Sequence, residues 1–119
     1  MKSENIILEM SFNFSLQIID LYKILIQNKE YILSRQVLRS GTSIGANIEE
    51  AIAAQSRKDF ISKMSIASKE ARETRYWLRL LDKSKLVDVE YKVYLNSIGH
   101  VINILTKIVK TTKEVNTVS

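Results

Sequence analysis

Three arginines recur at helical spacing in the second half of the chain, and their side chains could bind an anion. They are Arg72, Arg75 and Arg79. Guanidinium groups in a row on one side of a helix can contact successive phosphates of RNA or DNA. The same groups could instead pair with Glu73 and Asp82, or act only on the dipole at the end of their helix. Both interpretations stay open, and Arg39 and the lysines of the last helix are further candidates for phosphate contacts.

Paired carboxylates suggest a second kind of chemistry, a di-metal site in a helical bundle. Glu70 and Glu73 are three residues apart. Such sites also need a histidine three residues after a glutamate, and the residue three before the only histidine, His100, is Ser97. One histidine and no cysteine also leave no Ser/His/Asp triad and no sulfur-based zinc site. We therefore expect solvated or salt-bridged carboxylates, no metal, no cofactor and no enzymatic activity.

The elements that position these residues must be helices. The chain has 119 residues, 45% of them hydrophobic, with no proline and three glycines. Apolar residues repeat in steps of three and four through four segments of a single domain, 1–119, at about 4–28, 31–55, 57–82 and 88–112. Short polar connections favour an up-down-up-down antiparallel four-helix bundle, an all-α fold. Residues 113–119 lack the periodicity, and we expect them to fray.

Capping and glycine signals refine this picture. Ser56 followed by Asp59 resembles a capping box for the third helix, and Asp88 can cap the fourth. Gly41 and Gly45 form a GxxxG pattern in the second helix, where small residues permit close approach between helices. No strand precedes this pattern and no Gly-Lys-Ser/Thr follows it, so a phosphate-binding loop is excluded. We expect close packing or a local kink there.

The first helix is apolar on two sides. One side carries Phe14, Ile18, Leu21 and Leu25. The roughly opposite side carries Leu8, Phe12, Leu16, Ile19 and Ile26. A four-helix bundle gives each helix one inward face, so the second face forms an exposed patch unless something covers it. We expect copies of the chain to cover it; the alternative is another segment of the same chain.

Charge and the N-terminal segment bear on partners and location. The net charge of +5 suits an anionic partner, although helical proteins are often this basic without binding one. The N-terminal apolar run is short and is cut by Glu9, so we expect neither a secretion signal nor a membrane span there. We expect a cytoplasmic protein without a membrane partner.

The second and third segments resemble a known protein family. Residues 36–51 and 56–81 are similar to the four-helix-bundle family first recognised as proteins encoded in intervening sequences of bacterial 23S rRNA genes. The family pattern is Gln-x-Arg-Arg-Ala-x-x-Ser-Ile-x-x-Asn-Ile-x-Glu, and the matching residues here are Gln36, Arg39, Ser43, Ile44, Asn47, Ile48 and Glu50. Leu38 replaces the first arginine and Ser40 the alanine, which weakens any RNA contact assigned to the missing arginine.

The resemblance implies a bacterial protein, a left-handed up-down bundle and ring-shaped homo-oligomers, often pentamers, without an established reaction. Distantly similar bundles are accessory proteins of diversity-generating retroelements, which bind nucleic acid and a reverse transcriptase. Our leading hypothesis is a non-enzymatic homo-oligomeric bundle that binds RNA, DNA or a ribonucleoprotein through basic surface residues. The alternative is an assembly or adaptor ring that holds a protein partner, with the charge serving solubility.

Overall fold

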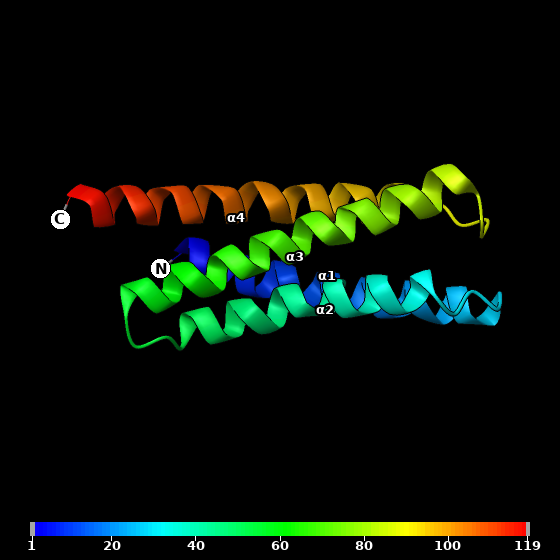
Figure 1. Ribbon diagram of the computed structural model, residues 1–119, viewed down its shortest axis with the longest axis horizontal. Helices are drawn as coiled ribbons and strands as arrows, with labels where there is room; N and C mark the ends of the chain where they lie inside the picture. The colour runs from blue at the N-terminus through cyan, green and yellow to red at the C-terminus, as the bar shows by residue number, and fades with distance from the viewer. Residues whose placement is uncertain (1, 119) are drawn as a thin grey trace.

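The computed structural model describes residues 2–118, with side chains described for residues 4–114. Its helices are α1 (Lys2–Gln27), α2 (Leu33–Ile52), α3 (Arg57–Ser84) and α4 (Lys92–Val118). Residues 2–118 contain no strand, so the predicted all-α class is confirmed. Figure 1 shows successive helices running in opposite directions along a rod of 52 × 22 × 21 Å.

Each helix packs against two others. α1 contacts α2 and α4, and α3 contacts the same two helices. α1 and α3 therefore lie at opposite corners of the bundle, as do α2 and α4. Every helix keeps an outer side that no other described helix covers, and these outer sides decide which apolar side chains meet solvent.

The apolar stripes predicted from the spacing form the core. The predicted inner stripe of α1 is at most 1% exposed along its whole length. The other helices contribute Val37, Ile44, Ile48, Met64, Ala67, Ala71, Leu78, Leu81, Ile98, Val101 and Leu105, all fully buried. Full burial of one large apolar side chain contributes about 1.5–3 kcal/mol, so these seams hold the four helices together. One polar pair lies within the core, where Thr74 Oγ1 donates to Ser40 Oγ at 2.8 Å.

The GxxxG segment brings α2 close to α1. A Cβ atom added at Gly41 would lie 2.9 Å from Ile18 Cγ2, whereas one at Gly45 would meet Ser15 Oγ at 3.4 Å. The predicted close packing is therefore confirmed at Gly41. At Gly45 a Cβ atom would make only an ordinary contact, so glycine is less strictly required there. α2 remains one unbroken helix through both glycines.

The predicted start of α3 is confirmed, whereas α2 starts later than predicted. Ser56 Oγ accepts from the Asp59 N–H at 3.0 Å, which confirms Ser56 as the N-cap. α2 begins at Leu33 rather than at residue 31. The Glu30 carboxylate caps it by accepting the N–H groups of Leu33 at 3.0 Å and Ser34 at 2.6 Å. A glutamate outside the helix thus supplies the cap.

The bounds of α4 differ most from the prediction. The helix begins at Lys92, so Asp88 is not its cap. Val87 and Tyr91 are buried in the core cluster, and residues 88–91 between α3 and α4 have no regular secondary structure. The Glu90 carboxylate accepts from the Lys92 N–H at 3.2 Å. α4 also continues to Val118, beyond the predicted end at residue 112, and Ser119 lies outside the described residues. No described helix is long and apolar enough to cross a membrane.

Candidate nucleic-acid interface

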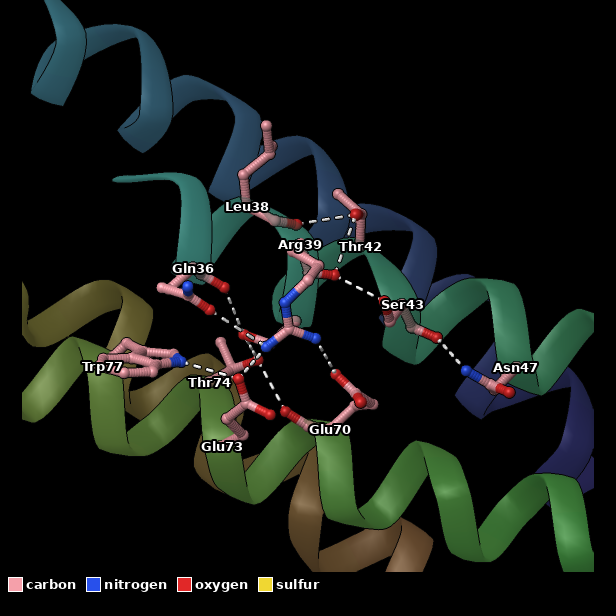
Figure 2. Close-up of polar contacts among 11 residues, drawn as sticks. Gln36, Leu38, Arg39, Thr42, Ser43, Asn47, Glu70, Glu73, Thr74 and Trp77 are labelled. Carbon is pink, nitrogen blue, oxygen red and sulfur yellow. Dashed lines mark hydrogen bonds and ion pairs between the residues drawn. The ribbon is translucent and has the colours of Figure 1, made fainter. Parts of the chain in front are cut away.

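The Arg39 side chain reaches from α2 to two carboxylates on α3. Its guanidinium contacts Glu70 Oε2 at 3.3 Å and also pairs with Glu73 Oε2. Glu73 Oε2 in turn accepts from the indole N–H of Trp77 at 2.9 Å, and Gln36 Oε1 accepts from Arg39 at 3.4 Å. Figure 2 shows these side chains converging between the two helices. The arrangement is a cross-helix clamp, defined here as Gln36, Arg39, Glu70, Glu73 and Trp77.

The clamp settles the role of the paired carboxylates and separates Arg39 from the other arginines. Glu70 and Glu73 are salt-bridged, as expected from their spacing and the lack of a partner histidine. In the described part of the chain, no group of three or more histidine, aspartate or glutamate side chains could hold a metal ion. Two nearby negative charges offset the positive charge of Arg39, which leaves little net attraction for a phosphate.

The other three arginines lie toward α4, on the opposite flank of α3 from the clamp. Arg72 Nη2 donates to Thr106 Oγ1 of α4 at 3.3 Å. Arg75 and Arg79 follow along the same flank at steps of three and four residues. Among residues 4–114, none of the three has a carboxylate partner, so the ion pairs considered with Glu73 and Asp82 are not formed.

An open groove runs between α3 and α4 beside Arg72. Its volume is about 570 Å³, and it is lined by Ser68, Arg72, Thr106, Val109, Lys110, Lys113 and Glu114. Lys110 lies within the predicted fourth helix, and Lys113 lies in the segment 113–119 that lacks apolar periodicity. The sequence did not place either lysine beside the arginines, because that requires knowing how α4 packs against α3. The signal that could have done so is the spacing of Thr106, Lys110 and Lys113 in steps of four and three, which puts them on one side of a helix.

The outer face of α1 is partly exposed, as the two-sided apolar pattern predicted. Phe12 is 61% exposed, Leu16 49% and Ile19 36%. Leu8 packs against the core cluster and is half-buried, and Ile26 is half-buried as well. No segment of the described chain covers the three exposed side chains, so the alternative that the same chain supplies a cover finds no support within residues 4–114.

A second apolar surface lies on the outer side of α3. It consists of Ile66, Tyr76 and Leu80, which are all exposed, beside the half-buried Trp77 of the clamp. The Tyr76 and Trp77 rings meet edge-on at a centroid distance of 5.2 Å. Because α1 and α3 occupy opposite corners, the molecule carries two different apolar outer faces pointing away from each other.

The chain matches one protein-family model and solved structures, and no curated protein matches it. One solved structure, a protein of unknown function from the S23 ribosomal protein family of Bacteroides thetaiotaomicron, is 46% identical in sequence. The similarity covers 91% of this chain and 98% of that one, with a TM-score of 0.87. The model of the 23S rRNA-intervening sequence protein family matches residues 3–107, which include the clamp and both apolar faces. The chain therefore belongs to the 23S rRNA-intervening sequence protein family.

Proposed function

We propose that this protein is a non-enzymatic, cytoplasmic helical bundle that assembles with copies of itself and binds RNA or DNA through basic surface residues. The observation that carries the nucleic-acid part is the α3 flank of Arg72, Arg75 and Arg79, which has no carboxylate partner within residues 4–114. Cations without local counter-charges attract a phosphate backbone and release its counterions on binding. Arg39, held between Glu70 and Glu73, contributes stability to the bundle in this proposal rather than affinity for a phosphate.

The exposed face of α1 supports self-association. Covering the exposed parts of Phe12, Leu16 and Ile19, which are 61%, 49% and 36% exposed, would contribute roughly 2–4 kcal/mol, because full burial of one large side chain is worth about 1.5–3 kcal/mol. The apolar face of α3 at the opposite corner supplies a second, different surface. Contacts between two different faces join copies head to tail, and such contacts close into a ring when the rotation per subunit fits. A ring is thus better supported than a two-fold dimer, and five subunits is the number that family resemblance favours.

A second candidate function is an adaptor ring that holds a protein partner. The observation that favours it lies at one end of the bundle, where the α1–α2 and α3–α4 connections both lie (Figure 1). Tyr31, Ile32 and Leu86 in these connections, and Val93 at the start of α4, are all more than half exposed. Exposed apolar groups at a loop end suit contact with another protein.

The two candidates are separated by one pair of measurements on the native chain. Light scattering gives the mass of the assembly, and binding of a labelled single-stranded RNA is followed as salt rises. The nucleic-acid proposal expects an oligomer whose affinity falls steeply with salt. A pull-down from a native extract, with and without ribonuclease, then distinguishes a partner held through RNA from one held directly. An oligomer that binds no RNA at low salt supports the adaptor function instead.

A further inference from the structure

We propose that the groove between α3 and α4 is the place where a single strand of RNA enters, with Arg72 and Lys110 contacting its phosphates. This inference rests on the proposed nucleic-acid function and names the site within it. Arg72 comes from α3 and Lys110 from α4, so one ligand would touch both helices. The groove also differs from the flank as a whole, because Arg75 and Arg79 do not line it.

The charges of the groove favour an anion. Arg72, Lys110 and Lys113 line it, and Glu114 is the one acidic side chain among the lining residues. Arg72 and Lys110 have no carboxylate partner within residues 4–114. By contrast, Arg39 and Lys63 each hold a carboxylate on a neighbouring helix. Cationic groups therefore remain available to a ligand on the α3–α4 side of the bundle and are engaged on the α2–α3 side.

The hydrogen bond from Arg72 to Thr106 positions the guanidinium at the groove. It uses one nitrogen, Nη2, at 3.3 Å. A guanidinium has five N–H donors, so most of them stay available for two parallel bonds to one phosphate. Thr106 is thus a positioning residue: it carries no charge and orients the group that does.

The size and lining of the groove suit a single strand. Its volume of about 570 Å³ falls within the usual range for sites that hold a small molecule or one nucleotide. Val109, half-buried at the groove, offers an apolar surface, and the Ser68 and Thr106 hydroxyls can bind a sugar hydroxyl. A duplex keeps its bases stacked inside and would present only its backbone and groove edges to this surface, so the apolar surface of Val109 favours an unpaired strand.

The test uses a labelled uridine oligonucleotide and the same oligonucleotide paired with its adenosine complement. Each contact to a single strand contributes roughly −0.7 to the slope of log affinity against log salt. Arg72→Ala and Lys110→Ala should each reduce that slope by about 0.7, and the double variant by about twice as much. Thr106→Val should weaken binding without changing the slope, because the charge is kept. The duplex should bind more weakly than the single strand to the native protein.

Matched controls remove the same charge outside the groove. Lys92→Ala and Lys107→Ala change exposed lysines of α4 that do not line it, and they should leave the slope at the native value. Circular dichroism and light scattering confirm that each variant keeps its helices and its assembly state. If the native protein binds no RNA at low salt, the proposed function fails together with this site.

Other results would overturn the site alone. Equal slope losses in groove and control variants would indicate diffuse attraction to a basic surface. A loss of salt slope seen only in Arg75→Ala and Arg79→Ala would place the phosphate contacts further along α3, outside the groove. Binding of phosphatidylserine vesicles that depends on Arg72, with no dependence for RNA, would assign the groove to a lipid phosphate instead.

Discussion

Gly41 lies so close to Ile18 of α1 that the fold leaves no room for a Cβ atom at this position. A Cβ there would meet Ile18 Cγ2 at 2.9 Å and Cγ1 at 3.0 Å, and Ile18 is fully buried and has little room to move. We expect Gly41→Ala to lower the free energy of unfolding by about 1–3 kcal/mol through overpacking. Gly45→Ala meets its first neighbour at 3.4 Å, so helix propensity should make it neutral or stabilising by up to about 1 kcal/mol. Urea unfolding of both variants measures these free energies, and equal changes in the two variants would contradict the prediction.

Tyr91 gives the protein a measurable response to alkaline pH. Burial, followed by the negative charges of Asp82 and Glu30, raises the pKa of its phenol from 10 to about 12. Its hydroxyl donates to the Val87 carbonyl oxygen at 3.1 Å. Because the folded pKa lies above the unfolded one, the phenol stabilises the fold fully below pH 10. That contribution, on the order of 2 kcal/mol, is lost as pH rises from 10 to 12.

Replacing Tyr91 with phenylalanine isolates this effect. Tyr91→Phe should lower stability by about 1 kcal/mol at neutral pH, because the hydrogen bond to Val87 is lost. Its unfolding free energy should then fall less steeply than that of the native protein above pH 10. Chemical unfolding across that range measures both curves, and parallel curves would show that Tyr91 does not carry the dependence. Tyr94, whose pKa is raised by burial and by Asp20, serves as the comparison through Tyr94→Phe.

At the scale of helices, the clamp joins α2 to α3, and we expect it to contribute to the free energy of unfolding rather than to RNA affinity. Arg39→Gln removes the ion pairs with Glu70 and Glu73 but keeps a polar side chain. Because the Arg39 side chain is half exposed, we expect a loss of at most about 1 kcal/mol in thermal unfolding. Trp77 is the only tryptophan and donates a hydrogen bond to Glu73, so its fluorescence should report the loss of the Arg39–Glu73 ion pair. The salt slope of RNA binding should stay native; a reduced slope would make Arg39 a phosphate contact.

The helices themselves were predictable because apolar spacing is a local property of the chain. Phe14, Ile18 and Leu21 were assigned to the core from their steps of four and three residues, and all are buried. The start of α4 was missed because burial of Val87 and Tyr91, a tertiary effect, outweighs the capping ability of Asp88. The carboxylate partners of Arg39, Glu70 and Glu73, lie more than thirty residues away on another helix, and no local pattern specifies them.

For the whole molecule, the two apolar faces make a prediction about how copies meet. Phe12→Glu with Ile19→Glu would block the face on α1, and Ile66→Glu with Leu80→Glu would block the face on α3. If α1 of one copy meets α3 of the next, each blocked variant alone should be monomeric. An equimolar mixture should then form a one-to-one dimer through the two intact faces, because one interface remains and cannot continue around a ring.

Light scattering of the separate and mixed variants reads this out directly. A dimer of the α3-blocked variant by itself would mean that α1 meets α1, and a native chain that stays monomeric at micromolar concentration would remove the assembly proposal. Lys92→Ala and Lys107→Ala serve as controls, since they change exposed polar positions of α4 and should leave the native mass unchanged.

The rod shape of the bundle also governs how the protein moves through solution. It is more than twice as long as it is wide, and its radius of gyration of 15.1 Å exceeds the value of about 13.5 Å expected for a compact chain of this length. An elongated particle meets more friction than a sphere of the same mass, so it diffuses more slowly and tumbles anisotropically. A single subunit should therefore elute from a sizing column ahead of spherical standards of its mass. Early elution by itself is accordingly no sign of a ring, whereas sedimentation equilibrium reports mass independently of shape.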